Sequence, residues 1–127
     1  MSRLGKKMNT NTYNLFTGVD LEIAELIQQR RYQLLIHSCI YYHLNGSVIS
    51  DKKWDEWARE LRNLQSQYPE ISRQVTLYEY FKDWDASTGA FLPITLSWVV
   101  CKAEQLSGRK SVRIVNDPKK LVKKKLF

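Results

Sequence analysis

Five side chains in the first half of the chain combine residue types that bind flat ligands. Asp51, Trp54 and Asp55 stand three and four residues apart, so a helix that begins near Asp51 presents all three on one face. Tyr41 and Tyr42 precede them, across a short turn-forming segment. Aromatic faces attract flat cations, and carboxylates accept hydrogen bonds from amides and hydroxyls. These residues therefore suit a flat cationic ring that carries an amide and sugar hydroxyls, as a nicotinamide on its ribose does.

Each of these side chains also has an ordinary structural explanation. A tyrosine at a helix end and a tryptophan at helical spacing commonly pack against a core, and an aspartate in a first helical turn stabilises the helix dipole. Spacing alone leaves both explanations open.

A helical hairpin is expected to position these residues. Apolar residues at helical spacing predict a first helix from Leu21, with Asp20 as its N-cap. The polar stretch 28–31 is expected to bend or break this helix. Asn45-Gly46 is expected to end it, because both residues tolerate the left-handed conformation of a helix C-terminus.

A second helix is expected to run back along the first. Ser50 can cap its N-terminus, with Asp51 in the first turn, and Tyr68-Pro69 ends it. The tight connection brings the face that carries Trp54 opposite Tyr41. The hairpin therefore predicts one pocket with aromatic walls and two carboxylates.

The remainder of the chain is harder to interpret. Residues 77–81 fit either a turn of helix or a short strand, and residues 83–89 have the composition of a loop. Pro93 suits the first turn of a third helix, which Gly108 ends. Residues 111–115 are a candidate strand without an obvious partner. The segment 81–92 is either a loop that covers the pocket or an ordinary connection.

The expected fold is mainly α: a small single domain built on a helical hairpin, with a basic C-terminal tail. We divide the 127 residues into a flexible arm (1–17), a helical domain (18–108) and a basic tail (109–127). The length fits one domain and is too short for a complete barrel or doubly wound dinucleotide-binding fold.

Targeting and redox signals are few. No apolar run reaches about 18 residues, and the polar, basic N-terminus does not read as a secretory signal. Cys39 and Cys101 lie far apart, without metal-binding spacing, so we expect reduced thiols in a cytoplasmic protein that binds no membrane. Cys39 stands among apolar residues and is expected to be a buried, inert thiol. Two carboxylates in one loop, Asp83 and Asp85, are too few to hold a metal ion, and no metal is expected.

The charge is concentrated at the C-terminal end. The whole chain has a net charge of +7, and the segment from Lys102 onward has nine Lys and Arg residues against two acids, which accounts for all of it. Such a tail either attracts nucleic acid or keeps the protein in solution. The nucleic-acid alternative would use the tail lysines: Lys119, Lys120, Lys123, Lys124 and Lys125.

Residues 41–70 closely resemble the N-terminal nicotinamide-binding (Ia) subdomain of NAD-dependent DNA ligases. The motifs that carry the resemblance are the aromatic pair Tyr41-Tyr42, Ile49-Ser50-Asp51, Trp54-Asp55, a leucine-rich helix and Pro69-Glu70. In that family the subdomain holds the nicotinamide mononucleotide (NMN) half of NAD. The resemblance implies that Tyr41 and Trp54 stack on the nicotinamide, that Asp51 and Asp55 bind its amide or ribose, and that Tyr42 lies on the phosphate side.

The chain also departs from the family pattern. Trp54 stands where a tyrosine is usual, and Asn45-Gly46-Ser47 replaces a linker in which Asp and Pro are common. A Lys-x-Asp-Gly nucleotidyltransferase motif is missing, and the nearest string, Lys82-Asp83-Trp84-Asp85, lacks the glycine. We therefore expect non-catalytic binding of NMN or NAD, in a small protein that resembles stand-alone, ligase-related phage proteins of the host cytoplasm.

Two alternatives stay open. One is a nucleic-acid-binding or ligase-associated accessory protein that uses the basic tail. The other is an enzyme that cleaves or transfers at the nicotinamide ribose through Asp51 or Asp55. The sequence does not indicate the oligomeric state.

Overall fold

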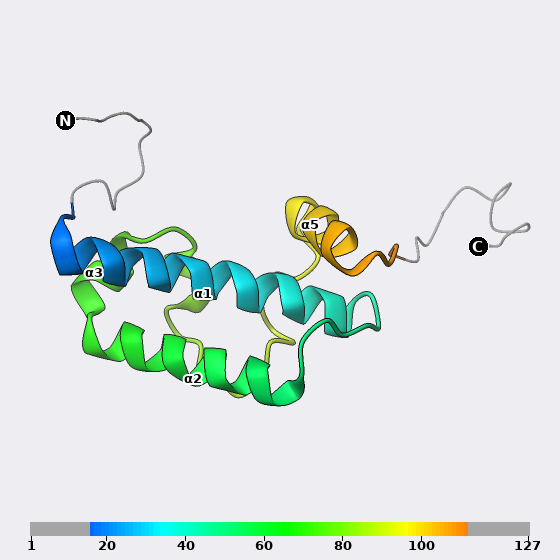
Figure 1. The fold of residues 1–127 in the computed structure, drawn as a ribbon, viewed down its shortest axis with the longest axis horizontal. Helices are drawn as coiled ribbons and strands as arrows, with labels where there is room; N and C mark the ends of the chain where they lie inside the picture. The colour runs from blue at the N-terminus through cyan, green and yellow to red at the C-terminus, as the bar shows by residue number, and fades with distance from the viewer. Residues whose placement is uncertain (1–15, 112–127) are drawn as a thin grey trace, which may run out of the picture.

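The computed structural model describes residues 16–111, and within this range every regular element is a helix. The helices are α1 (Gly18–Tyr42), α2 (Asp51–Gln67), α3 (Pro69–Gln74), α4 (Tyr78–Phe81) and α5 (Ser97–Ser107). The long helix α1 lies between α2 and α5, and α2 runs back along it (Figure 1). The predicted mainly α fold on a helical hairpin is therefore confirmed.

Helix α1 is the centre of the core because it is covered from two sides. Apolar side chains of α1 meet those of α2 on one side and those of α5 on the other. The fully buried apolar residues come from these helices and from α4: Ala24, Ile27, Leu34, Leu35, Cys39, Ile40, Leu61, Phe81, Val99 and Ala103.

The expected interruption of α1 at residues 28–31 is wrong. Arg31 is completely buried, and its guanidinium donates to the Gln65 side chain, to the hydroxyl and carbonyl of Ser72, and to the carbonyls of Val75 and Thr76. Burial lowers the pKa of Arg31 to about 10, so the group stays charged at neutral pH. A polar residue is accommodated here because four acceptor residues converge on it, and the helix continues unbroken.

The N-terminus of α1 also differs from the prediction. Thr17, not Asp20, occupies the N-cap position, and its side chain makes no capping hydrogen bond. Asp20 lies inside the first turn, where its carboxylate suits the positive end of the helix dipole.

The second helix follows the prediction closely. Ser50 caps α2 by accepting a hydrogen bond from the Lys53 amide at 3.0 Å, and Asp51 is in the first turn. Helix α2 ends at Gln67, and Pro69 then opens α3, which the sequence did not indicate. Within residues 77–81, Tyr78–Phe81 form a turn of helix, one of the two possibilities considered, and Leu77 precedes it as the N-cap.

The predicted start of the third helix is wrong. Helix α5 begins at Ser97, because residues 92–96 form turns: the Ile94 amide donates to the Leu92 carbonyl, and Leu96 is extended. Its predicted end is confirmed, since Gly108 caps the helix with a left-handed φ of 74°. The candidate strand lies largely outside the described residues, as do the N-terminal arm up to residue 15 and the tail lysines 119–125.

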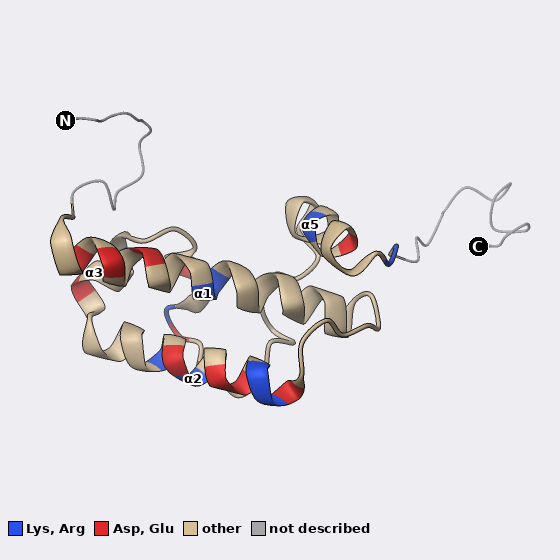
Figure 2. Cartoon of the chain, in the orientation of Figure 1, with Lys and Arg blue, Asp and Glu red and all other residues tan. Residues whose placement is uncertain are grey.

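Charge distribution and helix hydropathy within residues 16–111 are the two general surface properties that bear on function. Acidic and basic residues intermingle along the sequence of α2 (Figure 2). None of the helices between residues 16 and 111 has the length and apolar character that crossing a bilayer requires.

Candidate functional site

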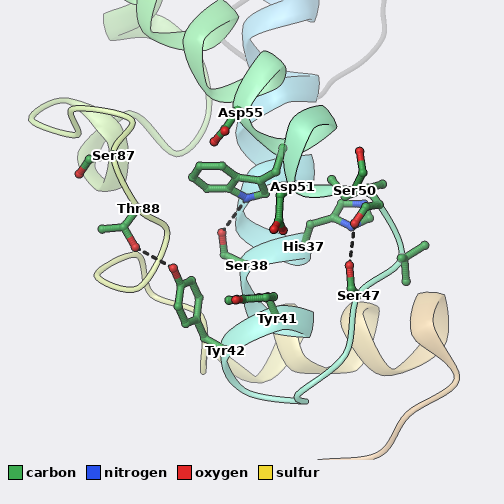
Figure 3. Close-up of a pocket in the computed structure, with 13 residues that line it drawn as sticks. His37, Ser38, Tyr41, Tyr42, Ser47, Ser50, Asp51, Asp55, Ser87 and Thr88 are labelled. Carbon is green, nitrogen blue, oxygen red and sulfur yellow. Dashed lines mark hydrogen bonds between the residues drawn. The ribbon is translucent and has the colours of Figure 1, made fainter.

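A pocket of about 290 Å³ opens at the mouth of the hairpin, where α1 ends and α2 begins (Figure 3). A loop from further along the chain closes its side. This volume is near the lower end of the range for small-molecule sites. The lining residues are His37, Ser38, Tyr41, Tyr42, Ser47, Val48, Ile49, Ser50, Asp51, Trp54, Asp55, Ser87 and Thr88. All five residues that the sequence singled out thus share one pocket.

The end of α1 presents two tyrosine rings to this pocket. The rings of Tyr41 and Tyr42 meet edge to face, with centroids 4.9 Å apart, and both side chains are exposed. The helix ends here because Asn45 adopts a left-handed φ of 56° and the Gly46 amide donates to the Ile40 carbonyl at 2.9 Å.

The hairpin turn is held from outside by Arg109. Its Nε donates to the Leu44 carbonyl at 2.9 Å. A Cβ on Gly46 would lie 2.4 Å from the Arg109 Cδ, so a larger residue here would displace the Arg109 side chain from its present position. The turn that aims the tyrosines is therefore a packed structure.

The start of α2 supplies the carboxylates and an indole. Asp51 and Asp55 are exposed, and Trp54 is half-buried, with its Nε1 donating to the Ser38 hydroxyl at 3.3 Å. Trp54 and Tyr41 line the same pocket, and Figure 3 shows Asp51 between α2 and the ring of Tyr41. The linker before α2 is ordered by the Ser47 hydroxyl, which donates to the Ile49 carbonyl.

Sequence reasoning missed His37 and Ser38 as pocket residues. Both precede the tyrosines by one helical turn, and this i, i+4 spacing was the available signal. His37 packs against the Trp57 ring at 5.6 Å, and burial lowers the pKa of its imidazole. Its Nδ1 is buried and has no hydrogen-bond partner among the described residues. A neutral imidazole with an unused ring nitrogen therefore lies beside the pocket.

The pocket offers a consistent set of interactions. Among the described residues, its lining has two carboxylates, three aromatic side chains from Tyr and Trp, and five serine or threonine hydroxyls, but no Lys or Arg. Such a site attracts a cationic ring through the aromatic faces and the carboxylates. Hydroxyls and amides of a ligand can donate to the same carboxylates.

The other side chains considered for chemistry have structural roles. Cys39 is fully buried, which confirms its predicted burial, and burial raises the pKa of its thiol to about 11, which disfavours the reactive thiolate. The Asp85 carboxylate accepts hydrogen bonds from the amide and hydroxyl of Ser87, and these hold its pKa below its usual value. Across the described range, no group of three or more His, Cys, Asp or Glu residues is placed to hold a metal ion.

Comparison with known proteins identifies relatives for the hairpin. Residues 20–74 match the family model of the DNA ligase-like N-terminal NAD+-binding domain. A DNA ligase of Bacteroides fragilis is 44% identical over 50 residues, which cover 39% of this chain and 8% of the ligase. A DNA ligase of Cellvibrio japonicus is 41% identical over 56 residues, covering 44% of this chain and 8% of the ligase.

A third relative matches a longer segment of the chain. A DNA ligase of Thermotoga neapolitana is 32% identical over 71 residues, covering 56% of this chain and 9% of the ligase. The matched region thus spans less than a tenth of each of these ligases, and no solved structure matches the chain. The matched segment comprises nearly all of α1, all of α2 and all of α3, so this part of the molecule is a domain similar to the N-terminal NAD+-binding domain of DNA ligases.

Proposed function

We propose that the pocket at the hairpin mouth binds the nicotinamide mononucleotide part of NMN or NAD. The observation that carries the proposal is the meeting of Tyr41, Tyr42, Trp54, Asp51 and Asp55 around one pocket, in a domain similar to an NAD+-binding domain. The Tyr41 and Trp54 faces stack on the nicotinamide ring. Asp51 and Asp55 accept hydrogen bonds from its amide or ribose, and Tyr42 lies on the phosphate side.

The expected affinity is modest. Each aromatic stack contributes about 1–3 kcal/mol, and the loss of ligand freedom offsets much of this gain. The two carboxylates are exposed, so water competes for the same hydrogen bonds. Dissociation constants between about 1 μM and 1 mM follow.

We propose further that this binding is not followed by adenylyl transfer within this chain. A nucleophilic lysine needs a lowered pKa or an adjacent base. Lys82, in the string nearest to the ligase motif, is exposed and pairs with Glu79 at 2.9 Å, and this partner raises its pKa. Its environment therefore favours the protonated, unreactive amine.

A ligand-observed NMR titration tests the binding. NMN and NAD should show saturable line broadening at millimolar concentration or below, and Trp54→Ala should weaken it. Absence of binding by both nucleotides would refute the proposal. In a separate incubation with NAD labelled in its adenylyl group, the protein should stay unlabelled, and a covalent adenylate would contradict the non-catalytic role.

Charge favours a second candidate function, nucleic-acid binding by the C-terminal segment. Six of the chain's Lys and Arg residues lie beyond Ser111, against one acid. Each phosphate that they neutralise lowers the logarithm of the binding constant by about 0.9 per decade of salt.

A truncation tests this candidate and is best placed after Ser111. Arg109 holds the hairpin turn, and the amide and hydroxyl of Ser111 donate to the Glu104 carboxylate, so both belong with the helical domain. Deletion of residues 112–127 should abolish binding of a duplex oligonucleotide at low salt and leave the melting temperature unchanged. Undiminished binding would assign it to the helical domain.

A further inference from the structure

The loop that closes the side of the pocket lies beyond the segment that matches the family model. The family match ends at residue 74, whereas Ser87 and Thr88 line the pocket opposite the end of α1 (Figure 3). We propose that residues 84–90 form a preassembled wall of the nucleotide site, in which Thr88 is a positioning residue for Tyr42. This inference rests on the proposed function, because it assigns how that site is completed.

The wall is internally bonded and anchored to the core. The Trp84 Nε1 donates to the Thr88 carbonyl at 2.7 Å, and the Ala90 amide donates to the Thr88 hydroxyl at 3.1 Å. The Trp84 ring packs edge to face on the buried Phe81 at 5.2 Å. The position of Thr88 is therefore fixed from both sides of the loop.

The backbone of the loop supports this interpretation. Ala86 has a φ of 71°, a strained conformation that side-chain-bearing residues rarely adopt. Such a residue persists only where its surroundings hold it. Here the Ser87 amide and hydroxyl both donate to the Asp85 carboxylate, at 2.9 and 2.7 Å.

Contacts at Thr88 and Gly89 join this wall to the hairpin, in addition to the edge-to-face packing of Trp84 on Trp54 at 6.1 Å. The Tyr42 phenol and the Thr88 hydroxyl are hydrogen-bonded at 2.8 Å. Gly89 is buried, and a Cβ there would lie 2.0 Å from the Ser38 Oγ and 3.2 Å from the Trp54 Cζ2. Gly89 has no positive φ, so it is needed for space, at a point where the loop meets the two helices.

The consequence for binding is preorganisation. Tyr42 is exposed, and without Thr88 its ring would sample several rotamers that a ligand would then have to restrict. The bond to Thr88 holds the ring at the pocket before the ligand arrives, which removes part of that cost. Gly89 lets the wall approach closely enough for this bond to form.

A series at residue 88 tests the inference by calorimetry with NMN on the full chain. Thr88→Val keeps the shape and removes the hydroxyl, and it should raise the dissociation constant about 2- to 10-fold. Thr88→Ser keeps the hydroxyl and should stay within about twofold of the wild type. Thr76→Val, a matched change at a residue that lines no pocket among those described, should have no effect.

A ligand-free measurement separates this inference from the proposed function. The wild type should show a nuclear Overhauser effect between the Thr88 methyl group and the Tyr42 ring, and Gly89→Ala should abolish it and weaken NMN binding more than 10-fold. Absence of this nuclear Overhauser effect in the wild type would overturn the inference that residues 84–90 form a preassembled wall. Equal NMN affinity of Thr88→Val and the wild type would overturn it as well. If the wild type binds neither NMN nor NAD, the proposed function fails, and the Overhauser effect alone then decides whether Thr88 positions Tyr42.

Discussion

Replacing Asp55 by asparagine should separate ligand recognition from folding. Asp55 is exposed and makes no hydrogen bond or ion pair within residues 16–111. The amide keeps the shape of the side chain and one acceptor oxygen, and removes the charge. If Asp55 accepts a hydrogen bond from the ligand, the change weakens a charge-assisted interaction of about 1.5–3 kcal/mol.

These energies translate into measurable changes. Complete loss of the interaction corresponds to a dissociation constant about 10- to 150-fold higher. Asp51 and Asp55 stand one turn apart, and removing their repulsion should stabilise the helix by about 0.2–0.5 kcal/mol. For a domain of this size, the melting temperature should therefore stay constant or rise by about 1–4 °C.

Calorimetry with NMN, paired with thermal melts, measures both quantities. Glu56→Gln is the matched control, because Glu56 is the next residue of α2, is exposed and lies outside the pocket lining. The control should leave NMN affinity within about twofold, since a screened surface charge acts weakly at a distance. Equal weakening by both variants would refute a direct contact. A lower melting temperature for Asp55→Asn without any change in affinity would assign the carboxylate a structural role.

Four further outcomes follow from the described contacts. Reduced NMN, with a neutral ring, should bind roughly 10-fold more weakly than NMN, as competition calorimetry can measure. One thiol, Cys101, should react with Ellman's reagent in the native protein and two should react in denaturant, because Cys39 is buried with a pKa raised to about 11. Arg31→Met should lower the free energy of unfolding by about 2–4 kcal/mol in urea titrations, since the buried acceptors around it lose their donor. Burial lowers the pKa of His37 below 6.5, so on acidification the unfolded chain takes up its proton before the folded protein does. The stability that His37 contributes is therefore complete above pH 6.5 and falls as the pH drops toward the folded pKa. Thermal melts of His37→Gln across this pH range should lack that fall.

The hairpin was predictable because its signals are local. Ser50 caps α2 through a bond to an amide three residues on, and Asn45-Gly46 forms a turn with its own preceding helix. Such interactions depend on residue type and short spacing, which the sequence displays directly.

The predictions that were wrong, for α1 and for the start of α5, concern segments whose structure depends on contacts not evident from local residue patterns. The continuity of α1 follows from acceptors at Gln65, Ser72 and residues 75–76, more than 30 positions from Arg31. Without knowledge of those partners, the polar residues 28–31 indicate an interruption of the apolar face of the first helix. The late start of α5 depends on the turns at 92–96, although Pro93 is an acceptable first helical residue.

In the candidate site, too, the residues placed by local interactions were predictable, and those placed by contacts distant in sequence were not. The five residues named from sequence lie on two adjacent helix ends, so helical spacing and one turn suffice to place them together. Ser87 and Thr88 reach the pocket from more than 30 residues beyond Trp54. That approach is fixed by contacts distant in sequence, of Thr88 with Tyr42 and of Gly89 with Ser38 and Trp54. A composition typical of loops could suggest a cover but could not give its register.

Stability and recognition lie at different places on the hairpin. Arg31 lies outside the pocket lining, joins α1 to the second half of α2 and to α3, and has a wholly buried guanidinium. At the mouth, Asp51, Asp55, Tyr41 and Tyr42 are exposed, so their side chains contribute little apolar burial to the core. Among the five residues named from sequence, only Trp54 belongs to both regions, since it is half-buried, donates to Ser38 and packs on Trp84 at 6.1 Å. Substitutions of the exposed four therefore report on the ligand, whereas a Trp54 variant must be corrected for lost folding free energy before its effect on affinity is interpreted.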